Sequence, residues 1–267
     1  MEEHPDPRHF KPSGKEAPGF ADAAARAFTA GAFTAGATDY DAVRPSYPPE
    51  VAALVSGAVS LIDVGAGTGK LTSTLLERGR GRRVWAVDPS ISMLRVLRAA
   101  CPDVPVWRAT AEATGLRDGV VDAYVSAQTW HWVDADAASA EADRVVAPGG
   151  SLMLCWNTLD VSHPWVLRLS RISHSGDVHR EGFYPAVAAP WRLEREVRTR
   201  WFQAVTPEDL FALARTRSYW LRANAATQQK VEANLSWYLY ERLGFDRGQP
   251  VPLPYRTDAF LYRRGRR

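Results

Sequence analysis

The stretch LIDVGAGTGKL, residues 61–71, decides the fold. Gly65, Gly67 and Gly69 alternate directly after a short apolar run that predicts a buried strand. Glycine at this density costs backbone entropy, so we expect the loop to bring bare backbone close to another group. Asp63 stands just before the loop. The stretch therefore predicts a strand, a glycine turn and a helix start whose free N–H groups face a ligand.

Strands and helices alternate along the chain on both sides of this loop. The expected strands cover residues 59–64, 83–87, 104–108, 121–127 and 151–156, and the expected helices cover residues 49–56, 71–78, 90–100 and 135–146. Because the strands are apolar throughout, we expect a parallel sheet with helices on both faces.

The flanking segments are less regular. The prolines of residues 40–49 predict a turn-rich linker, and Pro148-Gly149-Gly150 predicts a turn before strand 151–156. Beyond residue 157 we expect a strand at 195–204, helices at 207–216 and 226–243, and a terminal strand at 259–262.

Two ligand classes use a glycine loop of this kind. A dinucleotide loop reads G-x-G-x-x-G, but its third glycine would fall on Lys70. A carboxylate such as Asp63 also sits poorly beside a pyrophosphate and suits an ammonium group. Asp88 ends the second strand, where a carboxylate accepts hydrogen bonds from ribose hydroxyls in either class. A nucleoside that carries an amino acid, S-adenosylmethionine, fits these features together.

Several further motifs resemble those of the class I S-adenosylmethionine-dependent methyltransferases. Beside the glycine loop, these are VDPS (87–90), TAEATGL (110–116) and VVAPGGSLML (145–154), and the resemblance is close over residues 40–160. YDAVRPSYPPEV (40–51), AQTWHWVD (127–134) and LPYRTDAFLYRR (253–264) resemble the small-molecule branch, including trans-aconitate-type methyltransferases. The resemblance implies an α/β fold, a Rossmann-like doubly wound seven-stranded sheet in the order 3-2-1-4-5-7-6 with strand 7 antiparallel.

The same resemblance implies which residues bind the cofactor. Asp63 and the loop would hold the methionine and sugar side, Asp88 the ribose, and residues 89–90 and 110–112 the adenine. Thr110 stands where the family often has an acid, so its bond to the adenine amino group would be weaker. The cofactor-binding prediction comprises Arg44, Asp63, Gly65, Ala66, Gly67, Gly69, Asp88, Pro89, Ser90, Thr110, Ala111, Glu112 and Ser126.

The acceptor side is less defined. Trp130 and His131 follow the fourth strand, where the acceptor should sit, and His131 is predicted as a base or a hydrogen-bond partner of the substrate. Packing is the alternative for both. Tyr40 is a second catalytic candidate, and Arg44 would pair with a carboxylate of cofactor or substrate, or hold the lid to the sheet.

Arg217 and Tyr219 complete the predicted substrate-binding set, with helix capping and packing as the alternative. No metal site is expected, because the spacing of His163, His174 and His179 does not suit helix-mounted ligands.

Composition bounds the class of protein. With 267 residues, 46% of them hydrophobic, and a formal net charge of +3, we expect one cytoplasmic domain with no membrane span and no nucleic-acid footprint. Residues 1–19 are predicted to be a disordered tail, and residues 20–267 a methyltransferase domain. Its predicted parts are a lid (20–48), a nucleotide-binding core (49–157), a cap insertion (158–192), and helices with the C-terminal strands (193–267). The two cysteines, Cys101 and Cys155, are expected to be reduced core residues.

The predicted function is S-adenosylmethionine-dependent methyl transfer to a small organic acceptor by in-line displacement, driven by positioning. A catalytically silent S-adenosylmethionine-binding module and, less favoured, an NAD(P)-linked oxidoreductase are the alternatives. A nucleic-acid methyltransferase ranks low, because Ser126 and the residues after it do not form an Asn/Asp-Pro-Pro-aromatic motif. The sequence leaves the acceptor, the methylated atom and the oligomeric state open.

Overall fold

The computed structural model describes residues 37–79, 81–175 and 179–265. Its strands are β1 (Ser60–Val64), β2 (Arg83–Asp88), β3 (Val106–Arg108), β4 (Val121–Ala127), β5 (Val146–Leu159), β6 (Trp191–Val205) and β7 (Val251–Arg264). Its α-helices are α2 (Ala37–Val43), α3 (Pro49–Leu54), α4 (Lys70–Glu77), α5 (Ile91–Ala100), α6 (Ala135–Val145), α7 (Pro164–Ile172), α8 (Pro207–Arg215), α9 (Ser218–Arg222) and α10 (Ala225–Ser236).

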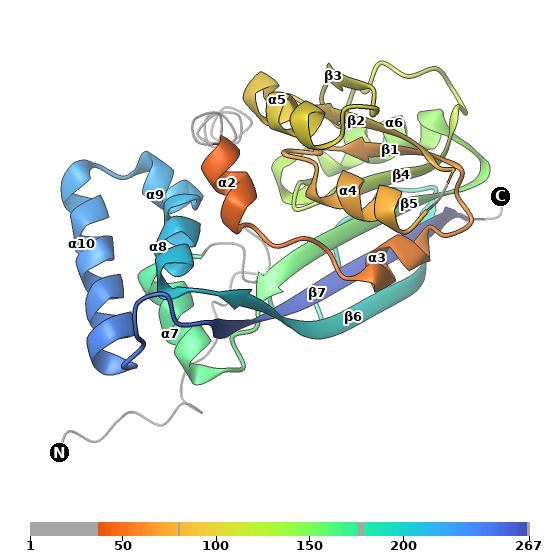
Figure 1. The fold of residues 1–267 in the computed structure, drawn as a ribbon. Helices are drawn as coiled ribbons and strands as arrows, with labels where there is room; N and C mark the ends of the chain where they lie inside the picture. The colour runs from red at the N-terminus through yellow and green to blue at the C-terminus, as the bar shows by residue number, and fades with distance from the viewer. Residues whose placement is uncertain (1–36, 80, 176–178, 266–267) are drawn as a thin grey trace. The chain divides into compact units, whose positions relative to one another are not determined.

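The seven strands form one sheet in the order β3-β2-β1-β4-β5-β7-β6 (Figure 1). Strands β1 to β5 pair in parallel, and β7 runs antiparallel to its neighbours. The predicted fold class and strand order are therefore confirmed. Parallel pairing matters for function because it brings the carboxyl ends of β1, β2 and β4 to one edge of the sheet.

The chain forms two compact units. Within the described residues, the first, which we call the glycine-loop unit, contains residues 37–79, 81–157, 185–199 and 257–265; the second, the helical unit, contains residues 158–175, 179–184 and 200–256. The tail predicted at residues 1–19 and most of the lid predicted at residues 20–48 lie outside the described residues. The domain boundaries given above stay predictions. Among the described residues, no helix has the length and apolar character that a membrane crossing requires.

Two segments have a local structure of a different kind from the one predicted. Residues 40–43 are helical, because α2 continues to Val43 and ends only where Pro45 restricts the residue before it. The turn predicted at Pro148-Gly149-Gly150 is a bulge within β5, where the register shifts between the pairs Val121↔Val146 and Ala123↔Ser151.

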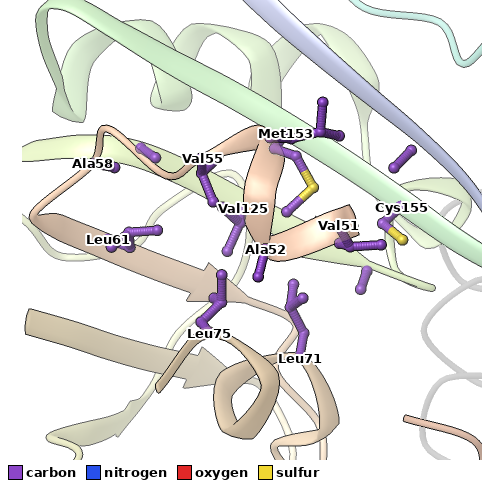
Figure 2. Packing of buried hydrophobic residues seen from close by; sticks show 14 of the residues in the cluster. Val51, Ala52, Val55, Ala58, Leu61, Leu71, Leu75, Val125, Met153 and Cys155 are labelled. Carbon is purple, nitrogen blue, oxygen red and sulfur yellow. The ribbon is translucent and has the colours of Figure 1, made fainter. Parts of the chain in front are cut away.

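An apolar cluster in the glycine-loop unit packs α3 and α4 against the sheet (Figure 2). Val51 of α3, Val55 directly after this helix, and Leu71 and Leu75 of α4 pack with residues of β1, β4 and β5. Burial of side chains of this size stabilises a fold by roughly 1.5–3 kcal/mol each. Cys155 belongs to this cluster, and burial raises the pKa of its thiol well above the ordinary value, so the thiol is neutral.

Asp122 of β4 fixes the start of β1. Its Oδ2 accepts hydrogen bonds from the Val59 and Ser60 amides at 2.9 and 2.8 Å and from the Ser60 hydroxyl at 2.9 Å. Partial burial opposes ionisation, but these bonds prevail and lower the pKa of the carboxyl below its ordinary value. The charged form is therefore the stabilising one.

We expect Asp122→Ala to lower the free energy of unfolding by about 2 kcal/mol at pH 7, because two backbone donors lose their partner. A lowered carboxyl pKa gives stability that is present above the unfolded-state value and is lost as the pH falls. Urea unfolding of both proteins should therefore converge toward pH 3. Asp118→Ala is the matched control, since Asp118 is exposed and pairs with Arg144 at the surface. Equal losses in the two variants would contradict this account.

Candidate cofactor and acceptor site

The glycine loop between β1 and α4 is built on left-handed backbone. Gly65, Gly67 and Gly69 have φ values of 68°, 56° and 92°. Residues other than glycine adopt such values only at a cost in free energy. A Cβ on Gly65 would lie 2.3 Å from the Thr129 side chain, and one on Gly69 would lie 2.8 Å from Leu97 Cγ. A Cβ on Gly67 would meet nothing within 4 Å. Gly65 and Gly69 thus serve packing, whereas Gly67 leaves open space at the loop.

Hydrogen bonds from neighbouring strand ends fix the loop. The amides of Gly65 and Ala66 donate to the Val87 carbonyl at 2.9 and 3.0 Å, and Thr129 Oγ1 donates to the Gly65 carbonyl at 3.1 Å. Asp88 Oδ2 accepts from the Gly67 amide at 2.9 Å. The ends of β1, β2 and β4 are thereby joined around one turn.

Asp88 has a structural role beside its predicted one. Its Oδ1 accepts from the Ser90 amide at 2.8 Å, so both carboxylate oxygens receive a backbone N–H. Burial raises the pKa of this carboxyl, while these two bonds oppose the shift. Each carboxylate oxygen accepts more than one hydrogen bond, and the predicted contact with ribose hydroxyls stays a prediction.

Asp63 is the other buried carboxylate of the site. It is 1% exposed, and its Oδ2 accepts a hydrogen bond from Thr72 Oγ1 at 2.6 Å. Burial raises its pKa to about 7, the Thr72 bond lowers it, and the charge of Asp88 raises it. Its Oδ1 is buried without a hydrogen-bond partner among the described residues. A buried acceptor of this kind needs a donor, and the ammonium group of the predicted cofactor fits it.

The segment before β1 contributes the predicted residues Tyr40 and Arg44 and a third residue, Tyr47, near Asp63. The Arg44 guanidinium lies 4.9 Å from the centre of the Tyr40 ring. Tyr47 was not predicted from the sequence. Burial raises its pKa well above the ordinary value, the carboxylate of Asp63 raises it further, and the guanidinium of Arg44 lowers it. Tyr47 is therefore within electrostatic reach of both Arg44 and Asp63. Its place in the proline-rich motif RPSYPP was the available signal.

The predicted adenine-side residues are held by local contacts. Ser90 Oγ caps α5 at the Met93 amide, and the Pro89 carbonyl accepts from Arg108 Nε at 2.9 Å. The Ala111 carbonyl accepts from the Tyr124 hydroxyl at 3.0 Å. Glu112 Oε1 accepts from the Asp134 amide at 2.9 Å, and Thr110 forms an isolated bridge with Ala113. Their adenine contacts stay predictions.

The carboxyl end of β4 carries Ser126, a predicted cofactor residue, and Gln128, which the predicted cofactor and substrate sets do not include. Ser126 is buried and donates from Oγ to the Val64 carbonyl at 2.8 Å. Gln128 has a φ of 54°, a left-handed value for a residue other than glycine. Its Nε2 donates to the Asn157 carbonyl at 2.5 Å.

Trp130 and His131 form a 3-10 turn with Trp132 directly after these residues. Trp130 is 4% exposed, and its indole N–H donates to the Ala186 carbonyl at 2.7 Å. His131 Nδ1 accepts a hydrogen bond from Trp156 Nε1 at 3.2 Å. Trp156 is 2% exposed in β5, so the ring of His131 is oriented by a rigid donor.

Arg217 and Tyr219 belong to the helical unit. Arg217 is 4% exposed at the start of α9, and the Tyr219 ring stacks on His174 with the ring centres 3.8 Å apart. Their predicted contact with the acceptor stays a prediction.

Comparisons with known proteins bear on the family and the fold of the chain. A family model described as a methyltransferase domain matches residues 62–154, which run from β1 into β5. An uncharacterized methyltransferase of Mycobacterium tuberculosis is 39% identical over 221 residues, covering 82% of this chain and 89% of that protein. Trans-aconitate 2-methyltransferase of Azoarcus sp. is 29% identical over 151 residues, covering 52% of this chain and 59% of that protein.

Among solved structures, a candidate type II methyltransferase from Anaeromyxobacter dehalogenans aligns with a TM-score of 0.54 and 23% identity. The alignment covers 82% of this chain and 96% of that one. This likeness supports the fold.

The first site prediction concerns the buried charge of Asp63. A raised carboxyl pKa means that the folded state holds its proton up to about pH 7, while the unfolded chain releases it near pH 4. Stability is therefore lost as the pH rises through this window. We expect Asp63→Asn to match the wild type near pH 4 and to exceed it by about 2–4 kcal/mol at pH 8 in ligand-free urea unfolding.

The same variant should lose cofactor affinity, since it removes the charge that faces the ammonium group. Asp41→Asn serves as the control, because Asp41 is partly exposed and pairs with Lys70 at 3.1 Å. A stability difference between Asp63→Asn and wild type that does not change with pH would refute the assignment.

The second site prediction concerns the open space at Gly67. In Gly67→Ala the methyl group would occupy that space, so we expect at least a tenfold loss of S-adenosylmethionine affinity in calorimetric titration. The matched control is Gly244→Ala in the helical unit, because Gly244 has a φ of 71° and equal open space. Backbone strain should lower the two melting temperatures similarly, but only Gly67→Ala should weaken binding. Unchanged affinity in Gly67→Ala would remove the loop from the site.

Proposed function

Because the chain belongs to the class I S-adenosylmethionine-dependent methyltransferases, we propose that it methylates a carboxylate oxygen of a small organic acid. S-adenosylmethionine, the cofactor of this family, supplies a methyl group that is already activated by its sulfonium. The enzyme's own residues must then hold both molecules in line and keep water away. The observation that carries the choice of acceptor is the hydrogen bond from Trp156 to His131.

This hydrogen bond determines what His131 offers to a substrate. An indole N–H only donates, so Nδ1 of His131 provides a lone pair and the proton of the neutral ring is on Nε2. In this tautomer the second ring nitrogen is a donor. A general base would instead need a lone pair directed at the acceptor. His131 is therefore suited to donate a hydrogen bond to an acceptor oxygen.

A carboxylate is the acceptor that such a site serves best. With a pKa of about 4, it is ionised at neutral pH and attacks without a base. A phenol or an alcohol keeps its proton and needs one. The relative named for trans-aconitate, a tricarboxylic acid, supports the same acceptor class.

The cofactor-side residues keep their predicted roles in this proposal. Asp63 would pair with the ammonium group, and Arg44 with the carboxylate of the methionine part. The glycine loop would lie against the sugar, and Asp88 would accept from its hydroxyls. Tyr40 stacks under Arg44, which favours a positioning role for Tyr40 over a catalytic one.

The test uses a panel of carboxylic acids, phenols and amines with wild type, His131→Gln and His131→Ala. Glutamine retains an N–H near the position of Nε2, so we expect His131→Gln to keep kcat/KM on acids within about threefold to tenfold. His131→Ala should lose about ten- to a hundredfold, the range for a hydrogen bond to a charged group. Turnover of phenols or amines alone, with the two variants equally inactive, would favour a base and refute the carboxylate proposal.

The tautomer has a readout that does not depend on activity. Proton–nitrogen NMR should assign the proton to Nε2 of the His131 ring, whose signals are identified by their absence in His131→Gln. Trp156→Phe should change this tautomer. Trp191→Phe is the control, because Trp191 is also buried and donates from its indole to the Ser139 carbonyl at 3.0 Å. A proton on Nδ1 in the wild type would overturn the argument.

A further inference from the structure

Gln128 holds a backbone conformation that costs free energy. Its φ of 54° is in the left-handed region, where a side chain other than glycine is strained. The residue stays there because its amide donates to the Cys155 carbonyl at 2.9 Å and the following Thr129 bonds to the Gly65 carbonyl. Strain of this kind persists where the surrounding structure enforces it, which is common at functional sites.

The side-chain amide of Gln128 is oriented from one side. A carbonyl oxygen only accepts, so the bond to the Asn157 carbonyl assigns the near atom as Nε2. Asn157 is itself fixed, because its Nδ2 donates to the Ser46 carbonyl at 3.0 Å and its Oδ1 accepts from Thr257 at 2.6 Å. The orientation of the Gln128 amide is therefore set by β5 and β7.

The other end of this amide is left without a partner. Oε1 of Gln128 is buried and has no hydrogen-bond partner among the described residues. A buried acceptor without a donor is costly, and here it coincides with backbone strain at the same residue. Two independent costs at one position indicate that the oxygen is reserved for a ligand.

The ligand in question is the acceptor. Asp63 Oδ1, another buried oxygen without a partner at these strand ends, is a carboxylate oxygen suited to a cation. Gln128 Oε1 is neutral and suits a neutral donor. Gln128 also turns its amide toward β5, the strand that carries Trp156, and lies three residues before His131. It thus belongs with the acceptor-side residues.

We propose that Gln128 is a specificity-determining residue whose Oε1 accepts a hydrogen bond from an O–H or N–H group of the acceptor. The preferred acceptor then carries a hydroxyl or an amide beside the group that is methylated. That this group is a carboxylate rests on the proposed function; the role of Gln128 as an acceptor of a donor group does not.

The experiment compares matched pairs that differ by one hydroxyl: malate with succinate, 3-hydroxybutyrate with butyrate, and 4-hydroxyphenylacetate with phenylacetate. We expect wild type to prefer the hydroxylated member of at least one pair by tenfold or more in kcat/KM. Gln128→Met, similar in length but without the oxygen, should bring the ratio close to one by lowering only the hydroxylated value. An unchanged ratio, or a wild type without any preference, would overturn the proposal.

Two further measurements separate this proposal from a structural or cofactor role. S-adenosylhomocysteine should bind Gln128→Met as tightly as wild type in calorimetric titration. The melting temperature of Gln128→Met should stay within about 2 °C of wild type, since the variant also removes a buried unpaired acceptor. Thr257→Val removes the buried hydrogen bond from the Thr257 hydroxyl to Asn157 Oδ1 and leaves that oxygen without this donor. This variant should melt several degrees below wild type. A tenfold loss of S-adenosylhomocysteine affinity, or a fall in melting temperature equal to that of Thr257→Val, would refute the role of Gln128.

If wild type methylates none of the acids, the carboxylate proposal fails while the Gln128 proposal is decided on amines and phenols paired in the same way. If acids are methylated but the ratio does not respond to Gln128→Met, the proposed function stands and the Gln128 proposal fails. Gln128→Gly and Gln128→Ala together test the strain, because both lose the side-chain bond to Asn157 but only glycine adopts the φ of 54° freely. Both variants should lose the preference, and Gln128→Gly should melt higher than Gln128→Ala. A lower melting temperature in Gln128→Gly than in Gln128→Ala would count against strain at this position.

Discussion

The tight turn from β1 into α4 is the constraint on which the rest of the site depends. Five residues must reverse direction while Thr129 and Leu97 pack against the glycines. The Val87 carbonyl and the Asp88 carboxylate take the amides of the turn. Because this one loop is bonded to the ends of β2 and β4 as well as β1, the positions of Asp63, Asp88 and the residues after β4 are fixed together. Only glycine adopts these left-handed backbone angles without strain and lets the Thr129 and Leu97 side chains come so close to the turn.

Two buried carboxylates sit beside that turn, and each carries a desolvation cost. Burial raises the pKa of both Asp63 and Asp88. Ionising these two carboxyl groups therefore lowers the stability of the ligand-free fold. A ligand that brings an ammonium group and hydroxyl donors relieves this cost. If these side chains bind the cofactor as proposed, ligand affinity and folding stability are linked through the same two carboxylates.

The sequence predicted the parts of the molecule that depend on local pattern. Glycine spacing, an acidic residue at each strand end and apolar runs identified the loop, Asp63, Asp88 and most strands, and β4 has the predicted bounds. β5 and β7 were predicted too short, because their extensions depend on pairing between distant segments. The bonds from Trp156 to His131 and from Gln128 to Asn157 join residues 25 and 29 positions apart. No spacing rule predicts such contacts, so the acceptor side needed the structure.

The two sides of the site differ in charge, and the chemistry explains why. The proposed cofactor side presents the carboxylates of Asp63 and Asp88, which would hold a cation in place. The acceptor side presents a neutral donor at His131 and a neutral acceptor at Gln128, beside the buried rings of Trp130 and Trp156. Methyl transfer from a sulfonium to a carboxylate begins with two opposite charges and ends with none. Weakly polar surroundings stabilise such a transition state relative to fully hydrated ions. A negatively charged base on this side would repel a carboxylate acceptor. In the proposed site, the fixed tautomer of His131 and the oriented amide of Gln128 would position the acceptor without adding charge.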